Sequence, residues 1–301
     1  TAFIHVLGVV LALPVVLVVG LPRREAWPFL AGSLFIHIGY YIALVGAYRH
    51  GELGLTYPVM RGLAPLLVAC SSAALLGESL KVQAWAGVVA ISVGVIAMGL
   101  SVSRAHAGAD ATEGTLEDGP GQAPTAAAPG DTANAVAAPL TAVAATRPRG
   151  PAHNPHAHHG KALRYALANA CLIALYTVVD GLGVRRSGDT AAYLATLFML
   201  DGIPYFLIVM WQRRDAVRPA LHHMAGRWTV ALPAALASLG SYGIALWAMT
   251  KAPVAAVAAL RETSVLFAAV IGALWLREAY GTRRIVATLL IVAGVITLRL
   301  S

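Results

Sequence analysis

Long apolar segments separated by short polar stretches dominate the pattern of this chain. Each segment is close to the roughly 20 residues that a helix needs to cross a bilayer. The pattern therefore predicts an all-α polytopic membrane protein. The segments that qualify as membrane-spanning helices are residues 2–20, 29–48, 55–76, 83–101, 162–182, 191–211, 229–249, 253–276 and 285–300.

Residues 102–160 do not follow this pattern. They are rich in Ala, Gly, Pro and Thr and have no helical period, which predicts a disordered linker. The linker ends in "PAHNPHAHHG", and imidazole clusters of this kind bind zinc, copper or nickel. Because the spacing fits no structural zinc motif, compositional drift is the plainer interpretation and no metal ligand is assigned. The histidines are His106, His153, His156, His158 and His159.

The two halves of the chain repeat one another. Residues 61–101 align with 261–301 without a gap, and 12 of 41 positions are identical. The identities include Arg61 with Arg261, and Glu78 with Glu278, so that each arginine precedes its glutamate by 17 residues. Shared apolar composition does not explain a repeated charged pair. Internal duplication is an architectural signal for transporters.

The repeat also predicts how the halves are built. Upstream, Pro14 matches Pro204 at an offset of 190, and helix 162–182 is left without a counterpart. We therefore expect ten helices in two five-helix repeats, nine of them in this sequence and the first preceding Thr1. An odd number of helices per repeat inverts the second half relative to the first. The predicted domains are 1–101, the 102–160 linker and 161–301.

Composition narrows the function classes. The chain is 58% hydrophobic and only 12% charged, against about 25% charged residues in soluble domains. Its net charge of +8 comes mostly from basic residues at helix ends, so no nucleic-acid partner is expected. The numbers of basic residues expected on the two faces of the membrane are almost equal, so they do not predict which face is cytoplasmic. Neither G-x-S-x-G nor H-E-x-x-H occurs, and no enzyme activity or cofactor is predicted.

Two stretches resemble a known family. "YPVMRGLAPLLVACSSAALLGESLKVQAWAGVVAISVGVIAMGL" and "ALRETSVLFAAVIGALWLREAYGTRRIVATLLIVAGVITLRL" each look like the end of an EamA repeat of the drug/metabolite transporter superfamily. The resemblance implies ten helices in two inverted repeats, cytoplasmic termini, and efflux or exchange of small metabolites. The absent first helix and the long linker depart from the family pattern.

The arginine pair suggests substrate contacts. Seventeen residues of helix span roughly 25 Å of the roughly 30 Å hydrocarbon core. Each arginine therefore lies just inside the face opposite its glutamate, and the inversion sends Arg61 and Arg261 toward opposite faces. Both are predicted to receive an anionic group of the substrate. Interfacial anchoring, with Asp201 or Glu262 as partner, is the alternative.

Two acids are candidates for proton coupling. Asp201 lies midway along an apolar helix near Pro204, where an ionised group is costly. Glu262 follows Arg261 directly, so the two side chains point about 100° apart on a helix. Glu78 and Glu278 stand at helix ends beside polar turns, and we expect each to cap the next helix or fix the turn.

Polar stripes complete the predicted site. Ser33, His37 and the Tyr40–Tyr41 pair share one helix face, as do Ser238 and Tyr242 on another, and Tyr57 lies one turn before Arg61. Such stripes line polar cavities. The predicted substrate-binding residues are Arg61, Arg261, Tyr57, His37, Tyr40, Tyr242 and Ser238.

The sequence thus predicts a secondary transporter that exports or exchanges small metabolites or drugs by alternating access. Its partners are a small-molecule substrate and the lipid bilayer, and its place is the bacterial inner membrane. The rivals are a metal-ion exporter that uses the histidine tract and a non-transporting sensor or scaffold. The sequence does not predict the oligomeric state.

Overall fold

The fold is a bundle of long helices. The computed structural model describes residues 2–51, 53–78, 80–113, 155–212, 214, 226–267, 270 and 281–301. Within these ranges there are helices and turns but no strands. The helices run in the order α1 (Ala2–Val19), η1 (Arg24–Ala26), α2 (Trp27–His50), α3 (Leu53–Leu76), α4 (Val82–Glu113), α6 (Pro155–Arg186), α7 (Thr190–Gln212), α9 (Trp228–Met249), α10 (Val254–Arg261) and α12 (Thr282–Arg299).

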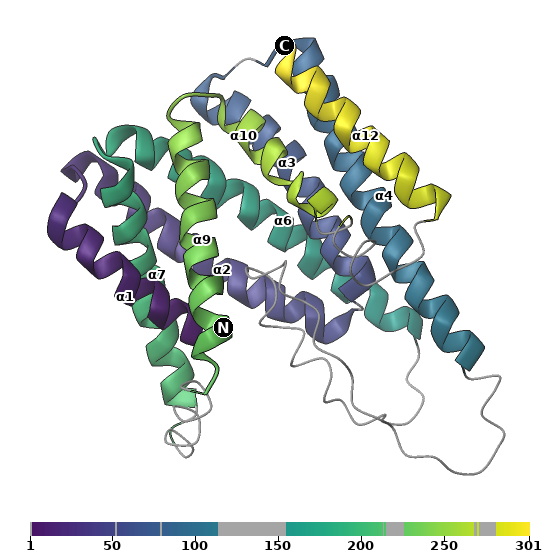
Figure 1. The fold of residues 1–301 in the computed structure, drawn as a ribbon, viewed down its shortest axis with the longest axis horizontal. Helices are drawn as coiled ribbons and strands as arrows, with labels where there is room; N and C mark the ends of the chain where they lie inside the picture. Colours follow the sequence, from purple (N-terminus) through teal and green to yellow (C-terminus); the bar gives the residue numbers. More distant parts are fainter. Residues whose placement is uncertain are drawn as a thin grey trace.

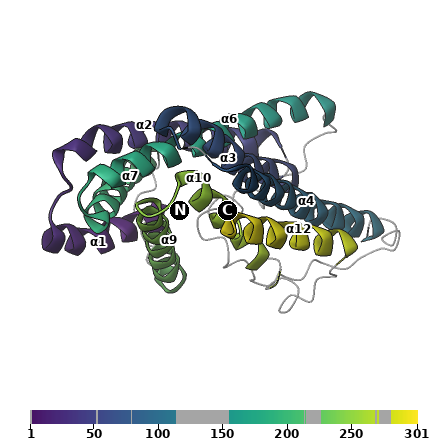
Figure 2. The same ribbon diagram turned by 90° about the horizontal axis from the view of Figure 1, so that it is seen from above.

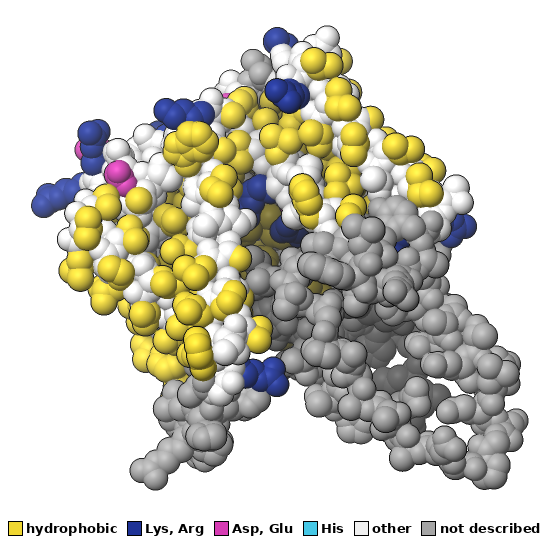
Figure 3. Space-filling model, viewed as in Figure 1, with side chains coloured by type: hydrophobic (Ala, Val, Ile, Leu, Met, Phe, Trp, Pro, Cys, Tyr) yellow, Lys and Arg dark blue, Asp and Glu magenta, His cyan; other side chains and the backbone are white. Residues whose placement is uncertain are grey.

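The helices have the length and surface of membrane spans. In the described part of the chain, six are long and apolar enough to cross a bilayer: Arg24–His50, Thr56–Leu76, Val82–Leu100, Gly160–Arg186, Thr190–Leu207 and Trp228–Met249. Large apolar side chains on these helices are exposed, including Phe35, Val82 and Ile244. Hydrophobic side chains cover much of the face in Figure 3, with Lys and Arg near its edges. The predicted all-α polytopic membrane fold is confirmed.

Repeat-related helices pack against each other in opposite directions. α4 and α12 lie side by side in both views (Figures 1 and 2). A Cβ on Gly87 or Gly294 would lie 2.8 Å from the other's carbonyl oxygen, and a Cβ on Gly94 would lie 3.1 Å from the Ala287 oxygen. Positions rise along α4 as they fall along α12, so the helices are antiparallel. Adding the repeat offset of 200 to Gly87 and Gly94 gives Ala287 and Gly294. The repeat therefore relates the two contacts to each other, as expected for inverted halves.

α1 and α7 form a second pair of this kind at the other end of the bundle (Figure 1). A Cβ on Gly8 would lie 3.2 Å from the Phe198 ring, and one on Gly202 would lie 3.0 Å from the His5 carbonyl oxygen. The order of these contacts makes the helices antiparallel. Gly8 and Phe198 are related by the repeat offset of 190, so their contact lies at the local two-fold axis.

α6 belongs to the second half but packs mainly against α2 and α3 of the first half. It crosses the middle of the molecule (Figure 1). Ala174 and Val178 of α6 join the main core with Val68 and Ala69 of α3 and Val257 of α10. One helix therefore joins the two halves.

The helix predicted at 253–276 is interrupted in the structure. α10 ends at Arg261, and residues 262 and 263 form a turn before the helix at 264–267. Tight i to i−3 bonds run from the Glu262 and Thr263 amides to Ala259 and Leu260. The Thr263 hydroxyl donates to the Leu260 carbonyl as well, in competition with the regular helical bond. The counterpart of α10, α3, continues unbroken through Arg61.

The helices also extend into both ends of the predicted linker. α4 continues to Glu113, and α6 begins at Pro155. Residues 114–154, with His153, lie outside the described residues, as does Glu278. The domain boundaries at 101/102 and 160/161 stay predictions.

The α4–α12 contact predicts a difference between two glycines. We expect Gly294→Ala to destabilise the protein by about 1–3 kcal/mol, because its Cβ meets backbone that does not yield easily. Gly240 in α9 has nothing within 4 Å of an added Cβ, so Gly240→Ala should be neutral or stabilising by up to about 1 kcal/mol. Thermal unfolding of the purified protein in detergent measures both. Equal melting temperatures for the two variants would contradict this packing.

Candidate functional site

A cavity opens among α1, α2, α6, α7 and α9, beside the end of α10. Its volume is about 190 Å³. Both halves of the chain contribute to its wall, which is largely aromatic. The polar and aromatic residues that line it are His5, His37, Tyr40, Tyr41, Tyr176, Phe198, Asp201, Tyr205, Ser238, Ser241, Tyr242 and Arg261.

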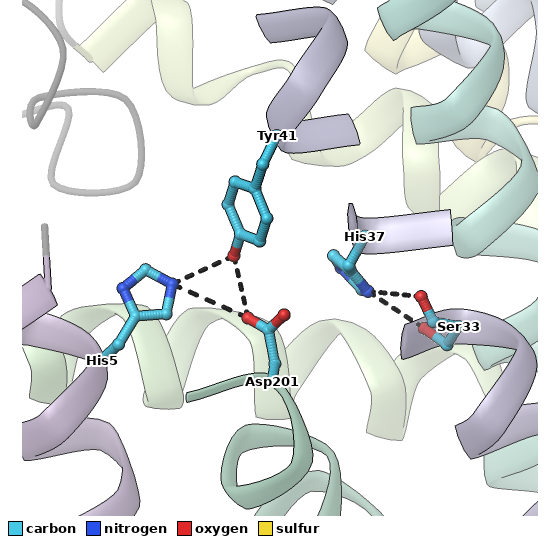
Figure 4. Close-up of polar contacts among 5 residues, drawn as sticks. All are labelled: His5, Ser33, His37, Tyr41 and Asp201. Carbon is cyan, nitrogen blue, oxygen red and sulfur yellow. Dashed lines mark hydrogen bonds and ion pairs between the residues drawn. The ribbon is translucent and has the colours of Figure 1, made fainter. Parts of the chain in front are cut away.

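Asp201 is held at one side of this cavity by α1 and α2 (Figure 4). The Tyr41 hydroxyl donates to its Oδ2 atom at 2.8 Å, and His5 Nε2 lies 3.0 Å from the same hydroxyl. His5 Nε2 is also 3.7 Å from Asp201 Oδ2, so that a protonated His5 forms an ion pair with the carboxylate. The His5 ring stacks on Tyr205 at 4.4 Å between centroids. Carboxylate, phenol and imidazole thus form one connected proton-binding group.

His37 forms a second polar group on α2 (Figure 4). Its Nδ1 atom lies 2.9 Å from the Ser33 carbonyl oxygen and 3.2 Å from the Ser33 hydroxyl. The carbonyl accepts only, so Nδ1 carries the proton and Nε2 is left for other partners. The ring stacks on Tyr176 of α6 at 4.5 Å between centroids. These contacts fix the orientation of His37 in the cavity wall.

Arg261 brings a positive charge to the cavity wall. It ends α10, where the helix dipole favours a cation. Its guanidinium carbon lies 5.1 Å from the centroid of the Tyr242 ring. Within the described ranges, no carboxylate lies within ion-pair distance of it.

Arg61 is engaged differently from its repeat counterpart. Its Nε atom lies 3.1 Å from Oε2 of Glu262, which joins α3 to the turn after α10. Neither atom has a hydrogen-bond partner within the described part of the chain, so the contact is an ion pair without an aligned N–H. The carboxylate of Glu262 feels the charges of both Arg61 and Arg261. The repeated arginines are thus unequal here, with one paired and the other at the cavity.

The structure separates the predicted site residues into two groups. The residues that line the cavity are Arg261, His37, Tyr40, Tyr242, Ser238 and Asp201. Arg61, Tyr57 and Glu262 do not line it. Tyr57 packs near Tyr48 and Met60 in a separate small cluster. Whether any of them contacts substrate or moves a proton stays a prediction.

The sequence interpretation missed Asp180, which lies deeper than Asp201. Asp180 is fully buried, whereas the Asp201 side chain is 19% exposed. Tyr193 Oη donates to its Oδ1 atom at 2.9 Å, and Tyr242 Oη donates to Oδ2. Asp180 sits near the end of the predicted span 162–182, but α6 continues to Arg186. The sequence did contain a signal for this residue, because Asp180 is an acidic residue within the apolar segment 162–182.

Glu78 caps a helix, as predicted in kind, but that helix is α10 of the second half and not the next helix in the chain. Its Oε2 atom accepts a hydrogen bond from the Val254 amide at 2.9 Å, at the start of α10. Its Oε1 atom is 2.7 Å from Arg185 Nη2. Arg185 also donates to the carbonyls of Met249 and Ala252. Glu78 of the first half therefore caps a helix of the second, and α6 supplies the arginine that joins them.

No cluster of three or more metal-ligating side chains occurs in the part of the chain that the structure describes. The side chains of the histidine tract lie outside that part.

Comparisons with known proteins agree with this architecture. The model of the EamA-like transporter family matches residues 160–300. No curated protein gives a significant match to the sequence. Seventeen chains of solved structures match. One is a crystal structure of a protein that aligns with a TM-score of 0.66 and 17% identity, over 99% of this chain and 85% of that chain. At that identity the likeness shows a shared fold alone.

The Arg61–Glu262 pair predicts unequal effects of its two neutral variants. Removing one partner of a buried pair costs about 3–5 kcal/mol when the other charge is left uncompensated. Glu262→Gln leaves Arg61 without a carboxylate, whereas Arg61→Gln leaves Glu262 close to Arg261. Glu262→Gln should therefore lower the melting temperature more than Arg61→Gln does. The double variant should recover part of the loss, and a double variant less stable than both singles would argue against the pair.

Proposed function

We propose that this chain, whose residues 160–300 match the model of the EamA-like transporter family, is a secondary active transporter of small organic anions. It exports or exchanges them across a bacterial inner membrane by alternating access. The observation that carries the proposal is Arg261, a cation without a carboxylate partner among the described residues, in the wall of an aromatic cavity.

The cavity suits an anion with an apolar or aromatic body. Its wall presents the rings of Tyr40, Tyr176 and Tyr242 beside the guanidinium. A guanidinium binds carboxylate or phosphate with two parallel hydrogen bonds, and the surrounding apolar surface strengthens that contact. The repeat counterpart of Arg261, Arg61, already has a counter-ion. Arg261 is therefore the group left to receive the substrate.

Asp201 is the proton-coupling residue in this proposal. It reaches the cavity from α7, while His5 reaches it from α1, the repeat counterpart of α7. A shift of α1 against α7 would change the distance between carboxylate and imidazole, and with it the free energy of binding a proton. Glu262 is the second candidate, because its partner Arg61 belongs to the other half.

Alternating access follows from the repeat. The second state of an inverted-repeat transporter exchanges the roles of the two halves. In that state Arg61 takes the cavity position and Arg261 leaves it. The break after α10 supplies a hinge for this exchange, because short i to i−3 turns inside helices often mark hinges.

The charge of the cavity is testable without knowing the substrate. Ser238 lines the cavity, so Ser238→Cys, with Cys70 and Cys171 replaced by Ser, reports on it. We define the anion preference as the reaction rate with a negatively charged methanethiosulfonate divided by the rate with a positively charged one. Arg261→Gln should lower the anion preference at least tenfold, since a nearby unit charge is worth about 1–4 kcal/mol.

Arg227→Gln is the matched control for this measurement. Arg227 is exposed and precedes α9, the helix that carries Ser238. Its loss should leave the anion preference unchanged. Equal anion preferences for Arg261→Gln and the parent would remove Arg261 from the proposed site.

Proton coupling predicts a separate effect at Asp201. In proteoliposomes, a small carboxylate or sulfonate that the parent protein carries should enter faster when a pH gradient is imposed. Asp201→Asn should abolish the response to the gradient but keep exchange of the same anion. Asp189→Asn, at an exposed site that caps α7, should behave like the parent. An intact response in Asp201→Asn would transfer the coupling role to another group.

A further inference from the structure

Asp180 joins four helices behind the cavity wall. It lies on α6, fully buried, and accepts hydrogen bonds from Tyr193 of α7 and Tyr242 of α9. Ser33 and His37 of α2 lie beside the same carboxylate. With no exposed surface, Asp180 does not itself touch a substrate. Two residues of its immediate surroundings, His37 and Tyr242, do face the cavity.

Tyr242 connects this carboxylate to the arginine of the cavity. Its hydroxyl donates a hydrogen bond to Asp180, and the guanidinium carbon of Arg261 lies 5.1 Å from the centroid of its ring. A phenol that donates to a carboxylate has a more electron-rich ring, and ring electron density is what attracts a cation. The hydrogen bond also fixes where the ring stands. Asp180 thereby influences both the position and the strength of the Arg261 contact.

Arg261 has a competing partner close by. Glu262 is the next residue, it is almost fully buried, and its carboxylate feels the charge of Arg261 as well as that of Arg61. A guanidinium released from the Tyr242 ring is drawn toward that carboxylate and away from the cavity. The Tyr242 ring therefore works against a collapse of the cavity cation onto its neighbour.

We propose that Asp180 is a positioning residue of the anion site: through its hydrogen bond from Tyr242, it holds Arg261 toward the cavity. This inference rests on the proposed function, since it concerns the same site. It adds a residue that lies outside the cavity and determines its charge. Tyr193 holds the other oxygen of Asp180 and so fixes the carboxylate itself.

The sign of one measurement separates positioning from simple electrostatics. Asp180→Asn removes an acid from near the cavity, so electrostatics alone would raise the anion preference of Ser238→Cys or leave it unchanged. Positioning predicts the opposite, a fall of about threefold or more, because Arg261 is no longer held. Tyr242→Phe keeps the ring and every charge but removes the hydrogen bond, and it should produce a similar fall.

The two changes should not be additive, because they break the same contact. The double variant Asp180→Asn with Tyr242→Phe should therefore resemble either single variant. Thr177→Val is the matched control on α6, since Thr177 is buried and its hydroxyl donates only to its own helix at Ile173. It should leave the anion preference unchanged. Monodisperse elution in detergent identifies the variants that fold.

Each outcome has a distinct meaning. A fall in both Asp180→Asn and Tyr242→Phe supports the inference. An unchanged or higher anion preference in either folded variant overturns it, and if Asp180→Asn does not fold, Tyr242→Phe alone decides. If Arg261→Gln also has no effect, the anion site itself fails; if Arg261→Gln lowers the anion preference, only the role of Asp180 is lost.

Discussion

The cost of an ionised group inside a bilayer is the constraint on which this structure depends. Insertion scales put that cost at about 2.5–3.5 kcal/mol for one charged residue at the centre of a helix. The buried charges meet it with partners from distant parts of the chain. Arg61 pairs with Glu262, Asp201 with Tyr41 and His5, and Asp180 with two tyrosines. Each of these pairs joins side chains from different helices.

Arg261 differs from these charged residues in the partners that surround it. In the described part of the chain, it lies against a tyrosine ring at a helix C-terminus and forms no direct ion pair with a carboxylate. Its repeat counterpart Arg61 has the carboxylate instead. In the function we propose, the anionic substrate supplies the counter-ion that Arg261 lacks, and the exchange of roles between the two halves moves the cavity from one face to the other.

The sequence was sufficient for the bundle but only partly for the site. Hydropathy located the spans, and the internal repeat predicted that the two halves have opposite orientations. Helix periodicity placed His37 with Tyr40 and Ser238 with Tyr242 on shared faces, and these residues line one cavity. Each of these features depends on residues close together in the sequence.

Most pairings between distant parts of the chain could not be predicted from the sequence. Asp180 meets Tyr242 62 residues away, and Asp201 meets Tyr41 160 residues away. The sequence offered both Asp201 and Glu262 as partners for the arginines, but the break after Arg261, which is where Glu262 meets Arg61, is concealed by the apolar pattern of 253–276. Neither helix period nor spacing specifies which face of one helix meets which face of another.

The central claim is that one cavity faces each side of the membrane in turn, and access to Ser238→Cys tests it most directly. The protein is reconstituted with a single cavity cysteine, and a membrane-impermeant methanethiosulfonate is supplied either outside the vesicles or trapped inside them. Alternating access predicts that molecules in a single orientation react from both sides. If molecules in a single orientation react with the reagent on one side of the membrane but not with the reagent on the other side, the account is contradicted.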